Sequence, residues 1–152
     1  MDRLSVSRRG VLAGLVVFSG ATAACARQTR ALTVYKTETC PCCGGWVEHM
    51  RAAGFQVEVQ DLPELSAIRR RYGVPDEASS CHTGLIGGYA IEGHVPAADV
   101  IRLLDEAPDV AGIAVPGMPL GSPGMEGRNG AREAYQTMLI ARNGSLSVFA
   151  QH

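Results

Sequence analysis

The chain has 152 residues, of which 46% are hydrophobic and 19% are charged, and its formal net charge is −1. This length favours one domain, and the composition supports a packed core rather than a disordered chain. Removing residues 1–26 takes away three arginines and one aspartate, which moves the net charge from −1 to −3. The remaining chain has no basic stripe, so this charge pattern argues against nucleic-acid binding.

Residues 1–26 have the order of an export signal. Arg3, Arg8 and Arg9 precede an apolar run at 11–24, which is too short to span a bilayer, and small residues follow. Residues 7–12, Ser-Arg-Arg-Gly-Val-Leu, resemble a twin-arginine signal, which exports folded cargo. The alternative is an ordinary secretory signal in which two arginines are adjacent by chance. We therefore expect a periplasmic protein whose mature domain comprises residues 27–152.

Cys25 has two interpretations. Residues 22–25, Thr-Ala-Ala-Cys, resemble a weak lipobox, in which a lipid on Cys25 would be the protein's only link to a membrane. Thr22 stands where such motifs prefer an aliphatic residue, and the alternative is cleavage after Ala23 or Ala26. Under either interpretation Cys25 is not a metal ligand, and four of the five cysteines remain in the mature chain.

Strands and helices alternate along the first part of the mature domain. β-Rich or alternating segments predict strands at 32–35, 55–61, 83–86 and 89–92, and apolar residues at helical spacing predict helices at 44–53, 65–72 and 96–104. Residues 37–43 are expected to form a loop. The resulting β-α-β-α-β-β-α order predicts an α/β fold with a thioredoxin-like core.

Residues 108–152 are expected to extend this core. The segment 115–127 is rich in Gly, Pro and Met and predicts an ordered loop. Segments 137–141 and 145–149 flank Asn143-Gly144, which predicts a type I′ β-hairpin. The expected architecture is therefore a thioredoxin-like core with a C-terminal loop and a β-hairpin extension.

Three cysteines lie between the first predicted strand and the first predicted helix. Cys40 and Cys43 form a C-x-x-C motif where thioredoxin-like folds carry their dithiol. Free N–H groups and the helix dipole favour thiolates there. Because a thiol–disulfide enzyme needs only two cysteines, the third sulfur, of Cys42, favours a soft metal such as Cu(I). The alternative is that Cys42 is a small buried hydrophobic residue.

Cys81 directly precedes the predicted strand at 83–86, in the loop where thioredoxin-like folds hold a cis-proline facing the dithiol. We therefore expect Cys81 to face Cys40 and Cys43. An even number of cysteines in an oxidising compartment first suggests disulfides. The clustering of these four favours a shared metal site, and a disulfide or a buried position elsewhere is the alternative for Cys81.

Histidine and methionine supply further candidate ligands. Successive side chains of an extended segment point to opposite faces, so His82 is not expected to enter the same site as Cys81. His94 is either a ligand or a structural histidine. The thioethers of Met118 and Met125 suit Cu(I), although methionine more often only fills gaps in a core. Trp46 and Met50, on the predicted helix at 44–53, are expected in the core.

Several blocks of the sequence resemble a family first described as a metal-binding domain of unknown function, which includes the periplasmic copper-resistance protein CopG. The blocks carrying the resemblance are residues 36–46, 80–83, 87–89, 92–96 and 115–125. The resemblance implies a thioredoxin-like fold, a multinuclear Cu(I) centre bound by thiolates, and a role in copper resistance beside other periplasmic copper-resistance proteins. It places the metal ligands at Cys40, Cys42, Cys43 and Cys81, with His94 and Met118 nearby.

Three functions are compatible with this sequence. The first is a copper-binding protein, and the sequence does not separate a copper sink from a copper-dependent oxidoreductase. The second is a thioredoxin-type thiol–disulfide oxidoreductase that uses Cys40 as nucleophile. The third is a zinc or iron–sulfur module, although zinc sites usually pair C-x-x-C with a second such unit or with a spaced histidine.

Overall fold

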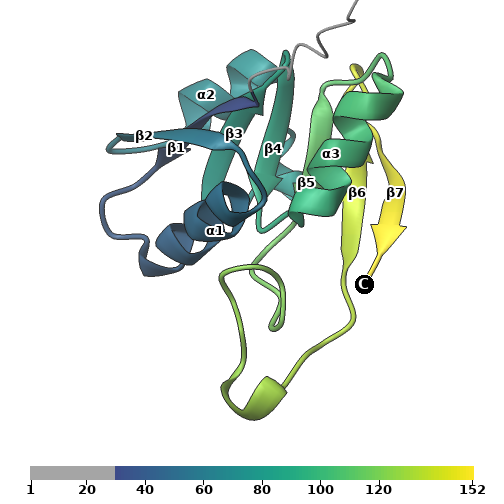
Figure 1. Cartoon of the computed structure of the whole chain (residues 1–152). Helices are drawn as coiled ribbons and strands as arrows, with labels where there is room; N and C mark the ends of the chain where they lie inside the picture. Colours follow the sequence, from purple (N-terminus) through teal and green to yellow (C-terminus); the bar gives the residue numbers. More distant parts are fainter. Residues whose placement is uncertain (1–29) are drawn as a thin grey trace, which may run out of the picture.

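The computed structural model describes residues 30–152. The predicted export signal at residues 1–26, including Cys25, lies outside the described residues. Within the described part, three α-helices flank a seven-stranded mixed sheet (Figure 1). None of the helices in residues 30–152 has the length and apolar character needed to cross a membrane.

The strands and helices follow one another in the predicted order, with one strand that the sequence did not predict. They are β1 (Ala31–Lys36), α1 (Pro41–Ala52), β2 (Gln56–Asp61), α2 (Ser66–Tyr72), the 3₁₀ turn η1 (Asp76–Ala78), β3 (His82–Ile86), β4 (Tyr89–Gly93), α3 (Ala97–Glu106), β5 (Gly112–Val115), the 3₁₀ turn η2 (Arg128–Gly130), β6 (Gln136–Ile140) and β7 (Leu146–Gln151).

The sheet has the strand order β2-β1-β3-β4-β5-β6-β7. β1 pairs in parallel with β2 and antiparallel with β3, and β3 and β4 form an antiparallel hairpin. These four strands with their helices are the predicted thioredoxin-like α/β core. β5 then pairs in parallel with β4, and the hairpin β6–β7 continues the same sheet.

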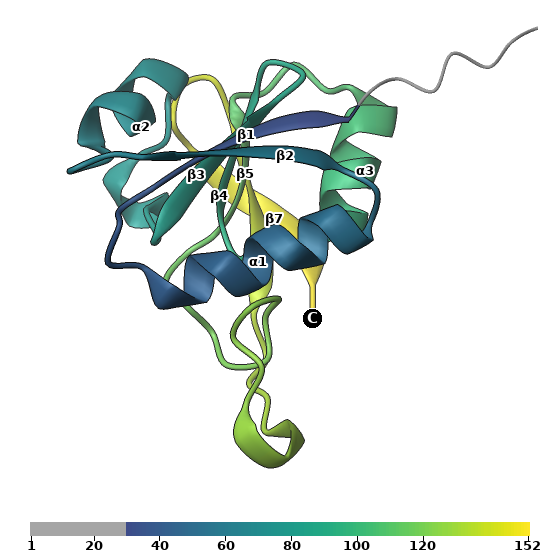
Figure 2. The same ribbon diagram turned by 60° about the vertical axis from the view of Figure 1, so that its left-hand side comes forward.

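Alternating side chains divide the core between the two faces of the sheet. Ile91 and Ile113 pack with α1 and α3, where Trp46 and Met50 are fully buried as predicted. Ala90 and Ala114 face the other side, against the segment that contains α2 and η1 (Figure 2). α2 has no buried residue of its own, and Val74 and Ala78, which follow it, supply buried contacts on this face.

Two local predictions were wrong. Residues 41–43 do not belong to the loop, because α1 begins at Pro41, a residue suited to the first helical position. The turn between β6 and β7 is not type I′, since Gly144 has a positive φ of 84° and Asn143 does not. The amide of Gly144 donates to the carbonyl of Ala141, and the amide of Ala141 donates to the carbonyl of Ser145. These bonds and the positive φ of Gly144 are those of a type I turn followed by a left-handed glycine.

Candidate metal centre

Three cysteines surround the start of α1. Cys40 caps the helix with an extended backbone, and Cys42 and Cys43 lie in the first turn. This turn directs Cys43 into the core, where it is fully buried, whereas the thiol of Cys42 is half-buried. The interpretation of Cys42 as a small buried hydrophobic residue is therefore not supported.

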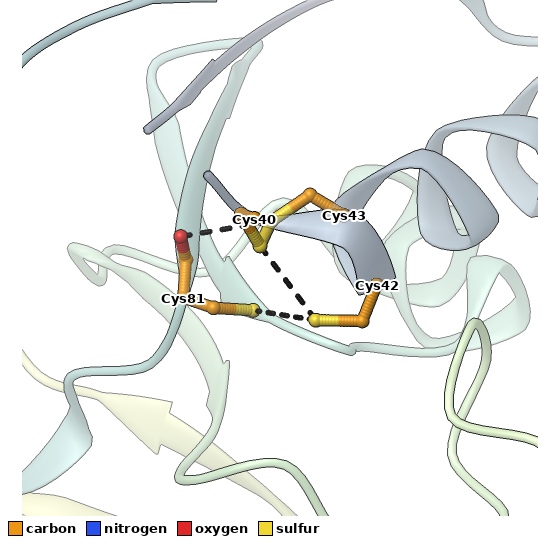
Figure 3. Close-up of side chains that lie close together, drawn as sticks. All are labelled: Cys40, Cys42, Cys43 and Cys81. Carbon is orange, nitrogen blue, oxygen red and sulfur yellow. Dashed lines mark hydrogen bonds between the residues drawn. A yellow bond between two sulfur atoms is a disulfide. The ribbon is translucent and has the colours of Figure 1, made fainter. Parts of the chain in front are cut away.

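Cys40 and Cys43 are joined by a disulfide in this structure (Figure 3). Their Cα atoms lie 5.6 Å apart because one helical turn separates them, and this spacing is normal for a disulfide. The clustering of the cysteines had favoured four thiols over disulfides, and the disulfide of this pair corrects that expectation. In this state Cys42 and Cys81 are the free cysteines of residues 30–152, and coordination by four thiolates requires reduction of the Cys40–Cys43 bond.

Cys81 lies immediately before β3 and faces the start of α1 (Figure 3). The Sγ atom of Cys42 lies 3.6 Å from that of Cys40 and 4.0 Å from that of Cys81, and all four Sγ atoms lie within 4.8 Å of one another. The Sγ atom of Cys43 also lies 3.7 Å from the carbonyl oxygen of Cys81. The fold therefore brings the distant cysteine to the other three, as the sequence analysis expected.

A buried carboxylate fixes the segment that carries Cys81. Glu92 of β4 is fully buried and accepts hydrogen bonds from Arg69 at 2.9 Å, from the amide of Ser80 at 2.7 Å and from the hydroxyl of Thr83 at 2.6 Å. Burial raises the pKa of Glu92, while Thr83 and Arg69 oppose this shift. Arg69 also donates to the carbonyl of Ser80. Sequence reasoning missed this network, whose one signal was a charged residue inside an apolar strand.

His94 lies directly beside Cys81. Its Nε2 atom is 3.0 Å from the Sγ atom of Cys81, and its Nδ1–H donates a 2.8 Å hydrogen bond to the carbonyl of Pro123. This bond places the ring proton on Nδ1 and leaves the Nε2 lone pair facing Cys81, as in histidines that ligate metals. Burial lowers the pKa of His94, which favours this neutral form.

His82 also reaches Cys81, which corrects the expectation from strand alternation. Cys81 precedes the first residue of β3, so the two side chains are not constrained to opposite faces of a strand. The Nδ1 atom of His82 lies 3.3 Å from the Sγ atom of Cys81, and its ring centroid lies 4.3 Å from that of Trp46. Burial lowers the pKa of His82 to about 3, so the ring is neutral at physiological pH.

The loop between β5 and β6 brings Met118 to the sulfur cluster, beside Cys42. The Sδ atom of Met118 lies 3.8 Å from the Sγ atom of Cys42, and the Met118 side chain is 52% exposed. The hydroxyl of Ser80 donates to the carbonyl of Gly117 and so ties this loop to the Cys81 segment. Met125 belongs to a tight turn of the same loop, in which its amide donates a hydrogen bond to the carbonyl of Ser122.

A hollow of about 560 Å³ gives solvent access to the outer side of the cluster. Its lining includes Cys40, Cys42, Cys81 and Met118, whereas His82 and His94 lie fully buried behind Cys81. Burial and the neighbouring Cys42 raise the pKa of the Cys81 thiol to about 12. Cys81 is thus protonated without metal, and a metal ion that binds it must displace this proton.

The chain was also compared with known proteins. A family model described as "Protein of unknown function, DUF411" matches residues 78–125. A solved structure titled "Copper resistance protein copG- Form 1" is 45% identical, covers 82% of this chain and 98% of its own, and superimposes with a TM-score of 0.77. "Copper resistance protein copG- Form 2" is 46% identical over 80% of this chain and 97% of its own, with a TM-score of 0.75.

No curated protein matches the sequence. The similarity to the two solved structures covers about four fifths of this chain and nearly all of theirs. The chain is therefore a member of the DUF411 family of CopG-like proteins.

Proposed function

We propose that this protein binds Cu(I) through the thiolates of Cys40, Cys42, Cys43 and Cys81 and acts in copper resistance outside the cytoplasm. One observation carries the proposal: four cysteine sulfurs from two distant segments lie within 4.8 Å of one another. Thiolates are soft ligands that suit Cu(I), zinc and iron–sulfur clusters. Among these, the titles of the two solved relatives, which name copper resistance, support copper.

Two further donors stand at the edges of the thiolate cluster. The thioether of Met118 lies on the solvent side of Cys42, and the Nε2 lone pair of His94 lies on the buried side of Cys81. Six donors exceed what one Cu(I) ion needs, and thiolates bridge metal ions readily. We therefore propose that the centre holds more than one copper ion and that Met118 and His94 are among its ligands.

Copper binding by all four cysteines depends on the oxidation state of the first pair. Exchange with an external dithiol, which supplies two electrons and two protons and is itself oxidised to a disulfide, converts the Cys40–Cys43 disulfide to two thiols, and Cu(I) then displaces the thiol protons. The export-signal pattern of residues 1–26 supports a periplasmic location. A lipid on Cys25 would attach the protein to a membrane in that compartment. In that compartment the protein would exchange copper with other copper-resistance proteins, and copper redox activity would be part of the same role.

The disulfide itself favours a second candidate function, thiol–disulfide exchange. Cys40 lines the solvent-accessible hollow at the N-terminus of α1, where a thioredoxin-type nucleophile would stand. Against this function, Cys42 and Cys81 add two thiols that a dithiol mechanism does not use. Cys81 also occupies the loop in which thioredoxin-like enzymes hold a cis-proline.

Elemental analysis separates these functions. The protein is isolated from its native compartment without oxygen, and copper, zinc, iron and sulfide are measured per chain. Copper at one or more ions per chain is the expected result. Iron with equivalent sulfide, or zinc alone, would replace copper with a different metal module, and a metal-free protein that rapidly reduces insulin would establish the oxidoreductase instead.

A further inference from the structure

Met118 is the most exposed methionine of residues 30–152. Its side chain is 52% exposed, whereas Met50 is fully buried and Met125 and Met138 are half-buried. Met118 also lines the hollow that opens onto the cysteines, so solvent reaches this side chain. An oxidant that enters the hollow from solvent therefore meets this thioether before those of the other three methionines.

The sulfur of Met118 is held against the cysteine cluster. Its Sδ atom lies 3.8 Å from the Sγ atom of Cys42. The hydroxyl of Ser80 donates to the carbonyl of Gly117, the residue before Met118, and so ties this part of the loop to the segment before β3. A chemical change at Sδ therefore occurs within van der Waals range of a proposed copper ligand.

The thioether differs chemically from the cysteine sulfurs beside it. A cysteine reacts as its thiolate, whereas a thioether carries no proton and reacts with oxidants in the one form it has. Cys40 and Cys43 are already joined as a disulfide, and Cys42 is a half-buried thiol. Sulfenic acids and disulfides are reversed by added thiols, but methionine sulfoxide is restored by sulfoxide reductases. This difference separates oxidation of Met118 from reversible oxidation of its cysteine neighbours.

We propose that Met118 is a site of reversible oxidation to the sulfoxide, and that this modification weakens Cu(I) binding at the thiolate centre. The inference rests on the proposed function and names a regulation of the same site. The oxidant is of the two-electron, oxygen-donating class, with hypochlorous acid as the probe. Its oxygen forms a bond to Sδ as the O–Cl bond breaks, the thioether loses two electrons, and chloride and a proton are released. The sulfoxide presents a hard oxygen where Cu(I) prefers a soft sulfur.

Restoration of Met118 requires a reaction that removes the added oxygen. Two thiols of a sulfoxide reductase supply two electrons and two protons, the S–O bond breaks, water leaves, and the thiols become a disulfide. Because Met118 is exposed on a loop, such an enzyme can reach it in the folded protein. The modification therefore predicts a methionine sulfoxide reductase as the enzyme class that restores copper binding.

The test measures which methionine is oxidised and what reverses the effect on copper. Copper-free protein with the Cys40–Cys43 disulfide closed is treated with limiting hypochlorous acid, quenched with free methionine and reduced with dithiothreitol. Tandem mass spectrometry locates the added oxygen, and chelator competition measures Cu(I) affinity before and after treatment with sulfoxide reductases for both epimers. We expect oxygen first at Met118, a loss of about tenfold in affinity that dithiothreitol does not reverse, and recovery with the reductases.

A double variant supplies the matched control. Met118→Leu combined with Leu120→Met moves the exposed thioether two positions along the same loop. Leu120 is 39% exposed and lies outside the lining of the hollow. This protein should take up oxygen at position 120, and its Cu(I) affinity should show no change that depends on the reductases.

The outcomes separate the oxidation site from the proposed function. If untreated, reduced wild-type protein does not bind Cu(I), the proposed function and this inference fail together. If that protein binds Cu(I) but Met125 or Met138 takes up oxygen before Met118, the inference fails and the thiolate centre stands. The same conclusion follows if dithiothreitol alone gives full affinity, or if the double variant shows an equal loss that the reductases reverse.

Discussion

The backbones of Gly45 in α1 and Gly124 in the loop between β5 and β6 lie in direct contact. A Cβ atom on Gly45 would stand 2.9 Å from Cα of Gly124, and one on Gly124 would stand 2.6 Å from the amide nitrogen of Trp46. This contact seats the loop on the first turns of α1, beside the cysteines. The same loop supplies Met118 and the carbonyl of Pro123 that orients His94, so the contact positions both ends of the candidate centre.

Gly45→Ala should therefore displace the loop. Although alanine favours a helix over glycine by about 1 kcal/mol, the added methyl meets backbone atoms that cannot rotate away. We expect a lower free energy of unfolding and weaker Cu(I) binding, measured by denaturant titration and chelator competition. The adjacent Gly44→Ala is the matched control, because nothing lies within 4 Å of its Cβ, and it should stabilise the protein by roughly 0.5–1 kcal/mol. Equal effects of the two variants would show that the loop contact is unimportant.

Glu92→Ala should destabilise the protein and weaken copper binding together. The change leaves Arg69, the amide of Ser80 and the hydroxyl of Thr83 without their shared acceptor beside Cys81. Breaking such a buried ion pair typically costs about 3–5 kcal/mol, which denaturant titration resolves. Glu48→Ala removes an exposed ion pair with Arg51 and should change stability by less than about 1 kcal/mol. A Glu92→Ala protein of wild-type stability would contradict the role assigned to the network.

His49 predicts a specific pH dependence of stability. Burial lowers the pKa of His49 from 6.5, and its neutral Nε2 accepts the hydrogen bond from Ala97, so the folded state disfavours the proton. The stability that it contributes is present above pH 6.5 and is lost as the pH falls below that value. His49→Gln retains an acceptor that does not titrate. The free energy of unfolding of wild type relative to this variant should fall between pH 7 and 5; a constant difference would exclude the effect.

Met118→Leu should weaken Cu(I) binding and leave folding unchanged. Leucine keeps the apolar volume but removes the thioether that lies 3.8 Å from the thiol of Cys42. Because the side chain is 52% exposed, its replacement should not alter the unfolding transition. A loss of about tenfold in affinity corresponds to about 1.4 kcal/mol. Chelator competition on the reduced protein measures it, and Leu120→Met, a change at another exposed residue of the same loop, serves as control.

Cys81→Ser should weaken Cu(I) binding by the reduced protein as strongly as Cys43→Ser does. Both sulfurs belong to the group that lies within 4.8 Å, so removing either takes away one shared thiolate. We expect a loss of tenfold or more in each case, or at least about 1.4 kcal/mol. Cys25→Ser is the control and should have no effect. A Cys81→Ser protein with unchanged affinity would remove Cys81 from the centre.

The sequence predicted those features that depend on local chemistry. The order of β1, α1, β2, α2, β3, β4 and α3 follows from hydrophobic periodicity and from the glycines and prolines that end each element. The C-x-x-C motif was recognised because it lies between a strand and a helix. β5 was missed because Gly112–Val115 has only four residues, all buried, and it acquires strand character by pairing with β4 and β6.

The sequence by itself thus determined the thioredoxin-like core and the identity of the soft donors. Only the tertiary structure decided how those donors are grouped. The buried Glu92 fixes the Cys81 segment, and the contact of Gly45 with Gly124 seats the loop. Together they separate the sulfurs that line the hollow, those of Cys40, Cys42, Cys81 and Met118, from the buried rings of His82 and His94. Spacing along the chain cannot encode this division, because it depends on contacts between residues tens of positions apart that form only when the sheet and its loop pack together.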